Sequence, residues 1–302
     1  MQNIIALIWD FDRTLVDGYM QDPIFRHYNV NSDRFWHEVN ELPGKYRREQ
    51  GVKVNRDTIY LNHFIKYARD GIFADLDNAR LKEFGKELKF YNGIPDFLKS
   101  SKDMIKDIEG AYEYNLKVEH YIISTGFREE IMGSSVVEYV DGVWGCELID
   151  GEDVKGRRHI SEIAYTIDNT TKTRAIFEIN KGASRDNDID VNVKMSDEQR
   201  RIDFKNMIYI ADGPSDIPAF SLVRSKGGYT FAVYPAGDVQ ALRQVETLRE
   251  DGRVDAFAEA DYSEGRTAAM LLRLKIEQLA QNIIDSEKRR LKPEGSVPVH
   301  LD

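Results

Sequence analysis

The residues with the clearest chemical meaning are two aspartates, Asp10 and Asp12, at the end of an apolar run. The run, Ile4 to Trp9, is typical of a buried parallel strand. Side chains two residues apart in an extended chain point the same way, so both carboxylates can face one crevice at the strand's carboxyl end. Two close carboxylates repel each other unless a cation or a shared proton intervenes. Because hard cations prefer oxygen ligands, the pair predicts a Mg²⁺ site.

Two other apolar runs also end in polar residues. Residues 120–123 precede Ser124, and residues 207–211 precede Asp212, with Asp216 four positions later. The carboxyl ends of neighbouring parallel strands meet at one edge of a sheet. We therefore expect these three polar side chains to gather near the aspartate pair.

The spacing of apolar residues predicts the elements that must position these groups. Helical stretches separate the apolar runs, which favours a doubly wound α/β fold with a parallel sheet. A fourth strand is expected at 229–234, and β-prone segments at 143–148 and 163–167 predict a core strand followed by a hairpin. Apolar residues at helical spacing predict helices at 57–69 and 75–89.

This organisation predicts two domains. An α-helical cap at residues 18–90 is inserted after the first strand of a core formed by residues 1–17 and 91–302. The tail from Lys292 contains Pro, Gly and Ser, and we expect it to be loosely ordered.

With its motifs in this order, the chain resembles the haloacid dehalogenase-like (HAD) superfamily of phosphohydrolases, in its phosphoserine phosphatase-like branch. The resemblance extends from about Asn3 to Pro235 and implies a Rossmann-like core. The residues that carry it are, in order, Asp10-Phe11-Asp12-Arg13-Thr14, Ser124, Lys172 and Asp212-Gly213-Pro214-Ser215-Asp216.

The resemblance implies a role for each motif residue. Asp10 would be the nucleophile that forms an aspartyl-phosphate, and Asp12 would serve as general acid and then base. Mg²⁺ would be held by the Asp10 carboxylate, the backbone carbonyl of Asp12 and Asp212. Asp216 would orient Lys172 or a metal-bound water. The phosphate group would contact Thr14, Ser124, Thr125, Gly126 and Lys172.

The charges favour the same assignment on physical grounds. A carboxylate that attacks a phosphate faces charge repulsion, which a divalent cation and an ammonium group remove. Lys181 is a rival for the lysine. We prefer Lys172 because it opens the helix before the last motif, whereas Lys181 falls in that helix's last turn, where a cation is favoured anyway.

Two basic features remain open. Arg13 occupies a position where glycine is frequent in the superfamily, and it could reach the cap or the substrate, or face solvent. In the cap, Lys45, Arg47, Arg48 and Lys53 form a basic patch, which is either an exposed helical face or a clamp for an acidic or phosphorylated leaving group.

Composition argues against several other classes of protein. The net charge of −10 over 302 residues disfavours a general binder of nucleic acid or of anionic membranes. No apolar run approaches the ~20 residues of a membrane span. The single cysteine, Cys146, fits a reducing compartment. We expect a cytoplasmic protein whose partner is a small phosphorylated metabolite; the oligomeric state cannot be read from the sequence.

The sequence thus predicts an enzyme, a Mg²⁺-dependent phosphatase that hydrolyses a small phosphomonoester through an aspartyl-phosphate. One alternative is a phosphotransferase or phosphomutase on the same scaffold. Another is a non-catalytic protein that binds Mg²⁺ and a phosphorylated ligand, although such a protein would not need the acid Asp12. A dehalogenase would need neither Asp12 nor Asp212, and a phosphonate hydrolase would need a cap lysine that forms an imine.

Overall fold

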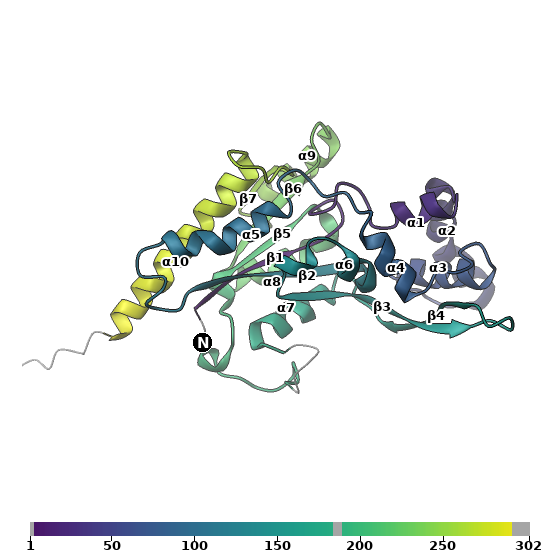
Figure 1. The fold of residues 1–302 in the computed structure, drawn as a ribbon, viewed down its shortest axis with the longest axis horizontal. Coiled ribbons are helices and arrows are strands. Elements are labelled where there is room, and N and C mark those ends of the chain that lie inside the picture. The colour runs from purple at the N-terminus through teal and green to yellow at the C-terminus, as the bar shows by residue number, and fades with distance from the viewer. Residues whose placement is uncertain (1–2, 184–188, 292–302) are drawn as a thin grey trace, which may run out of the picture.

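A seven-stranded sheet runs through the centre of the molecule (Figure 1). The structure, a computed structural model, describes residues 3–183 and 189–291, so the tail from Lys292 lies outside the described residues. The strands are β1 (Ile4–Trp9), β2 (Lys117–Phe127), β3 (Gly142–Glu152), β4 (Arg158–Tyr165), β5 (Met207–Ala211), β6 (Tyr229–Tyr234) and β7 (Ala256–Glu259). Their order is β4-β3-β2-β1-β5-β6-β7. All neighbours are parallel except β3 and β4, which confirms the predicted α/β class with a mainly parallel sheet.

The central strands lie where the sequence predicts them. β1, β5 and β6 occupy the predicted residues, and all of β1 and β5 is buried. A strand covered on both faces must be apolar on both sides, so its sequence is a continuous apolar run. β3 differs from the expectation, because this one strand of 11 residues pairs with β2 and then continues into the hairpin with β4. The predicted core strand and the first strand of the predicted hairpin are therefore one and the same strand, β3.

Helices cover both faces of the sheet, as a doubly wound fold requires (Figure 1). On one side lie α5 (Asp96–Asp103) and α10 (Thr267–Leu291), where the Arg273 guanidinium lies 5.5 Å from the centre of the Phe97 ring. On the other side lie α7 (Lys172–Lys181) and α8 (Ile217–Ser225). The remaining helices of this part are α6 (Arg128–Gly133) and α9 (Val239–Glu250), with 3-10 turns at Met104–Asp107, Val137–Tyr139, Asp197–Gln199, Phe204–Asn206 and Pro214–Asp216.

Four helices between β1 and β2 gather beside the far end of the β3–β4 hairpin (Figure 1). They are α1 (Asp22–His27), α2 (Ser32–Gln50), α3 (Ile59–Arg69) and α4 (Asn78–Gly85). Aromatic rings form their core, and the Phe35 ring centre lies 5.0 Å from that of Phe25 and 4.9 Å from that of Phe64. Phe64 also lies 5.0 Å from Phe127 of β2, so this aromatic core is continuous with the sheet.

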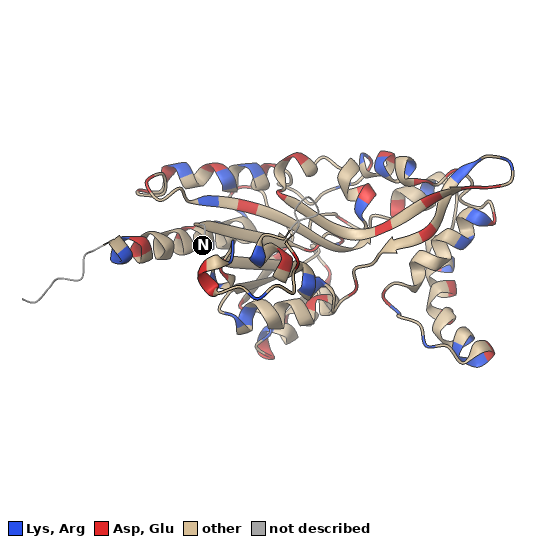
Figure 2. Cartoon of the chain, turned by 90° about the horizontal axis from the view of Figure 1, so that it is seen from below, with Lys and Arg blue, Asp and Glu red and all other residues tan. Residues whose placement is uncertain are grey.

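These four helices agree in part with the expected pattern. α3 lies within the predicted helix at 57–69, α4 is shorter than the predicted 75–89, and α2 was not predicted. The division of the chain into a cap at 18–90 and a core stays a prediction. Acidic and basic residues are interspersed along the helices and the hairpin, so the net negative charge is spread over the molecule (Figure 2).

Candidate active site

A buried lysine joins two of the aspartates that the motifs single out. Lys172 Nζ lies 2.7 Å from Asp10 Oδ1 and 2.6 Å from Asp216 Oδ1, and the Lys172 side chain is 1% exposed. Lys172 is the first residue of α7, while Asp10 follows β1. Burial opposes the charge on the ammonium group, but the two carboxylates prevail and raise the pKa of Lys172. The lysine is therefore charged where it meets Asp10.

Asp216 is held in place by three donors. Besides Lys172, the Tyr209 hydroxyl donates to Asp216 Oδ1 over 2.6 Å, and the Ser215 hydroxyl donates to Oδ2 over 2.8 Å. Both carboxylate oxygens are thus engaged within the protein. This arrangement suits Asp216 to orienting the lysine.

Three carboxylates form a cluster at this edge of the sheet. One oxygen each of Asp10, Asp212 and Asp216 lies within 4.8 Å of the others. Burial, with repulsion from neighbouring carboxylates, raises the pKa of Asp10 to about 6 and that of Asp212 to about 7. An all-oxygen set with excess negative charge matches the preference of Mg²⁺. The residues present therefore fit a Mg²⁺ ion, and Asp10 and Asp212 are the members of the cluster with the fewest protein partners.

Asp12 lies beside the cluster, and its pKa is raised further than the pKa values of Asp10 and Asp212. Its Oδ1 accepts a hydrogen bond of 2.8 Å from the backbone N–H of Met20. Burial, and next the nearby charge of Asp10, raise the pKa of Asp12 to about 8. The carboxyl group is therefore largely protonated at neutral pH and holds a proton that it can donate.

Ser124 lies on a bulge, not at the end of its strand as expected. β2 continues to Phe127, and its register with β3 shifts between Ile123 and Phe127. Such bulges re-aim side chains near functional sites. The buried Ser124 hydroxyl accepts a 2.9 Å hydrogen bond from the N–H of Gly126. Among the described residues it makes no hydrogen bond to the aspartate cluster, so its contact with phosphate stays a prediction.

The other residues of the expected phosphate site surround this bulge. A Cβ on Gly126 would lie 2.3 Å from the sulfur of Met20, so a larger residue there would require the Met20 side chain to move. The carbonyl of Thr125 accepts a 2.6 Å hydrogen bond from the Tyr60 hydroxyl of α3. Thr14 is fully buried, and its hydroxyl lies 3.5 Å from Asp10 Oδ2. The contact of Tyr60 with Thr125 joins helix α3 to this edge of the sheet.

The rival lysine lies at the other end of α7. Lys181 Nζ donates to the carbonyl of Val193 over 2.7 Å and also to that of Val191. At 1.5 Å per residue, the two ends of this helix are separated by about 14 Å. The fold thus brings Lys172, and not Lys181, to Asp10.

Arg13 makes a contact that the sequence did not reveal. Its Nε lies 3.4 Å from Asp212 Oδ2, and its Nη2 lies 3.3 Å from Asp238 Oδ2. It therefore turns toward the carboxylate edge, where it partly neutralises a candidate metal ligand. Its φ of 56° is in the left-handed region, which explains why glycine is common at this position of the motif.

A cavity of about 400 Å³ opens beside Asp12. It lies between the sheet edge and the helices α2 and α3, and its lining residues are Asp12, Tyr19, Gln21, Trp36, Val39, Asn40, Arg56, Asp57, Tyr60 and Thr125. A leaving group in this cavity would sit next to the candidate acid.

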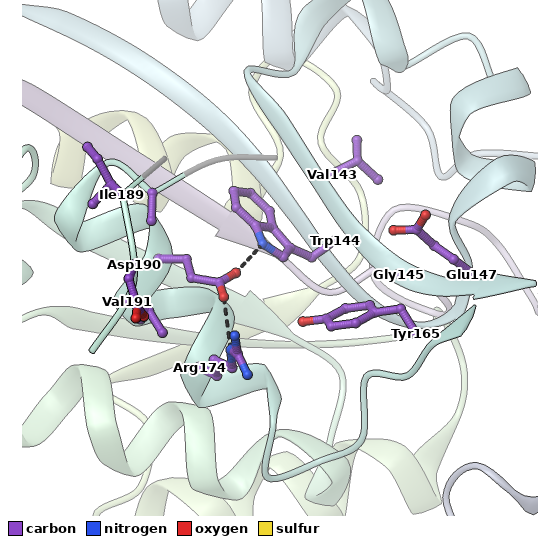
Figure 3. Close-up of a pocket in the computed structure, with 11 residues that line it drawn as sticks. Val143, Trp144, Gly145, Glu147, Tyr165, Arg174, Ile189, Asp190 and Val191 are labelled. Carbon is purple, nitrogen blue, oxygen red and sulfur yellow. Dashed lines mark hydrogen bonds and ion pairs between the residues drawn. The ribbon is translucent and has the colours of Figure 1, made fainter. Parts of the chain in front are cut away.

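A second cavity of similar size, about 390 Å³, lies between β3, β4 and α7 (Figure 3). Trp144 Nε1 and Arg174 Nε donate hydrogen bonds to the carboxylate of Glu178, over 2.7 and 3.0 Å. Figure 3 marks both bonds with dashed lines that meet at one carboxylate. None of the motif residues lines this cavity. It is separate from the candidate active site.

Comparison with solved structures identifies the fold. A phospho-aspartyl intermediate analogue of phosphoserine phosphatase matches with a TM-score of 0.51 at 16% identity, over 90% of this chain and 99% of that one. Apo phosphoserine phosphatase gives the same score and identity, over 90% and 98%. A HAD family hydrolase of Salmonella enterica serovar Typhi matches at 0.50 and 13% identity, over 85% and 67%. The chain therefore has the fold of phosphoserine phosphatase and of this HAD family hydrolase, as the motifs predicted.

Comparison of sequences places the chain in a family. No family model matches it. An uncharacterized protein of Borreliella burgdorferi is 38% identical over 277 residues, which cover 87% of this chain and 93% of that protein. The chain belongs to the same family as that protein. Within residues 3–183 and 189–291, no helix is both long and apolar enough to cross a membrane.

Proposed function

We propose that the protein is a Mg²⁺-dependent phosphatase that hydrolyses a small-molecule phosphomonoester through an aspartyl-phosphate on Asp10. The observation that carries this proposal is the contact of the buried Lys172 ammonium with Asp10, 2.7 Å away, in a cluster that also contains Asp212. A carboxylate held beside a cation, at the carboxyl end of a parallel sheet, is equipped to attack an anionic phosphorus centre.

In the proposed reaction, an Asp10 oxygen forms a bond to phosphorus while the bond from phosphorus to the leaving oxygen breaks. Asp12 donates its proton to that oxygen, and the alcohol departs. A water then attacks phosphorus and gives its proton to Asp12, which releases phosphate and restores Asp10. Lys172, oriented by Asp216, neutralises charge in both steps. When bound, Mg²⁺ would be held by the Asp10 carboxylate, the backbone carbonyl of Asp12 and Asp212, and would supply further neutralisation of the phosphate.

The remaining groups extend this proposal. Thr14, Ser124, Thr125 and Gly126 bind the phosphate oxygens around the bulge of β2. Residues 18–90 form a cap that closes over the site, on a core of residues 1–17 and 91–302. The location is cytoplasmic, in keeping with the single cysteine.

The direct test replaces the nucleophile. Asp10→Asn removes the attacking carboxylate but keeps its shape, so turnover of p-nitrophenyl phosphate with Mg²⁺ should fall by a factor of at least ~1000. Asp17→Asn, at an exposed carboxylate seven residues on, is the matched control and should keep wild-type turnover. Activity retained in the Asp10 variant would remove the nucleophile from the proposal. Absence of turnover in the wild-type protein, over a panel of phosphomonoesters, would favour the non-catalytic alternative.

A further inference from the structure

A third and larger cavity adjoins the one beside Asp12. The inner cavity, of about 400 Å³, is lined by Asp12 and also by Arg56 and Asp57. The outer cavity, of about 1100 Å³, is lined by the same Arg56 and Asp57, and by Arg47 and Lys53. A ligand that starts at the catalytic acid can therefore extend past Arg56 into the outer cavity.

The cations that line the outer cavity have no ion-pair partner among the described residues. The side chains of Arg47, Lys53 and Arg56 are exposed, and none makes an ion pair or hydrogen bond with a residue that the structure describes. Arg47 lies in the last turn of α2, where the helix dipole favours a cation. Lys53 and Arg56 lie beyond Gly51, which ends that helix, so the dipole does not account for them.

The two acidic residues that line the outer cavity, Asp57 and Asp168, already accept hydrogen bonds from the protein. Asp168 accepts hydrogen bonds from the backbone N–H groups of Thr170 and Thr171, over 2.9 and 2.7 Å, and from the Asn55 amide over 2.9 Å. Asp57 accepts a longer one from the N–H of residue 169. The three cations still outnumber these two carboxylates, so the lining of the outer cavity carries a net formal charge of +1 in a chain whose net charge is −10.

The inner cavity has aromatic walls. The ring centres of Trp36 and Tyr60 lie 5.8 Å apart, and the Tyr60 hydroxyl is fixed by its 2.6 Å hydrogen bond to the carbonyl of Thr125. Tyr19, which is 47% exposed, lines the same space. Such walls suit a ring or another flat apolar body, with Asn40 as a polar neighbour.

We propose that the substrate is a phosphomonoester whose leaving group has two parts. A ring or other apolar body occupies the inner cavity against the wall formed by Trp36 and Tyr60, and a second anionic group, a carboxylate or a phosphate, is bound by Arg56, which lines both cavities. Lys53 and Arg47 support this second anion. The inference rests on the proposed phosphatase function, which supplies the first phosphate at Asp10.

The kinetic test compares phenyl phosphate with 4-carboxyphenyl phosphate and 1,4-phenylene bisphosphate, which carry the two kinds of second anion. The wild-type kcat/KM should be about tenfold higher for at least one of the two compounds that carry a second anionic group, as a charge-assisted hydrogen bond provides. Arg56→Gln should bring that ratio close to one, and Lys53→Gln should reduce it less. The compound with the higher ratio identifies the anion. A wild-type ratio near one, or a ratio unchanged in Arg56→Gln, would overturn the proposal.

Two matched controls carry the same changes at exposed cations of α3 that line neither cavity. Arg69→Gln and Lys66→Gln should keep the wild-type ratio. Loss of the ratio in either control would show a general effect of surface charge and overturn the assignment to Arg56.

A binding measurement separates this inference from the proposed function. Calorimetry with Mg²⁺ present would compare benzylphosphonate with 4-carboxybenzylphosphonate and 1,4-xylylene bisphosphonate, which cannot be hydrolysed. Tighter binding of a compound with a second anion, lost in Arg56→Gln, supports the subsite even if no phosphate ester is turned over. Turnover of phenyl phosphate together with equal binding of all three compounds would refute the subsite and leave the phosphatase function standing.

Discussion

Glu130 is a buried carboxyl group without a hydrogen-bond partner among the described residues. Both of its oxygens are unpartnered, and the residue is 0% exposed. Burial, with added repulsion from Asp12, Asp22 and Glu87, raises the pKa of Glu130 well above its usual value. An isolated buried carboxylate would be very unfavourable, so this group remains protonated in the folded protein.

This protonation makes stability depend on pH. Folded Glu130 keeps its proton while the unfolded chain ionises above pH ~4.5, so the group lowers the free energy of unfolding by up to about 1.4 kcal/mol for each pH unit above that value. Glu130→Gln cannot ionise, so its stability relative to wild type should increase as the pH rises above the range in which the unfolded chain ionises, as measured by urea denaturation at a series of pH values. Glu129→Gln, beside it on the helix and 30% exposed, should follow the wild-type profile. Parallel profiles for all three proteins would mean that Glu130 is ionised.

At the scale of elements, α4 and α6 cross at two glycines. A Cβ on Gly85 would lie 2.0 Å from the carbonyl oxygen of Glu130, and one on Gly133 would lie 1.8 Å from that of Lys82. The backbones therefore touch, with no room for a side chain between them. The crossing attaches a helix of residues 18–90 to the helix that follows β2.

Gly133→Ala should force this crossing apart. Overpacking against backbone atoms costs about 1–3 kcal/mol, so we expect the free energy of unfolding to fall by that amount in chemical denaturation. Gly44→Ala is the matched control, because within α2 the new Cβ would meet only the flexible end of Arg48, at 3.1 Å. There the change should be neutral or stabilise by up to about 1 kcal/mol, as helix propensity favours alanine. An equal loss in both variants would contradict the close crossing.

At the scale of the whole molecule, a Mg²⁺ ion held by the carboxylate cluster would couple metal binding to folding. A ligand that binds only the folded protein stabilises it by about 2.7 kcal/mol at 100 times its Kd. Mg²⁺ should therefore raise the melting temperature measured by calorimetry, EDTA should reverse the shift, and turnover should follow both. Asp212→Asn should lose the shift, whereas Asp17→Asn should keep it. A melting temperature that does not respond to Mg²⁺ would remove the metal from the proposal.

The fold also decides where the cavities lie. The inner cavity combines Asp12 and Thr125, near the sheet, with Trp36 and Tyr60 from the inserted helices. These residues are separated by tens of positions in the chain, so no local pattern could predict that they line one space. The sequence showed the basic patch at residues 45–53. It could not show that a cavity lined by part of this patch adjoins the cavity beside Asp12.

Elements with a strong local signal were predictable. β1, β5 and β6 were located because strands buried on both faces must be continuously apolar. β7 has only four residues, and α2 contains Pro43 in its interior, which breaks the pattern of a helix. Both elements form because tertiary packing outweighs a weak local preference.

The sequence by itself determined the residue types of the site: carboxylates and a lysine at the ends of strands and at the start of a helix. The tertiary structure decided which of them meet. It brought Lys172 to Asp10 across 162 positions, left Lys181 at the far end of its helix, and turned Arg13 toward Asp212. The physical reason is that the spacing of apolar residues depends only on residues that are close together in the chain. The pairing of buried charges depends on groups that only the complete fold brings together.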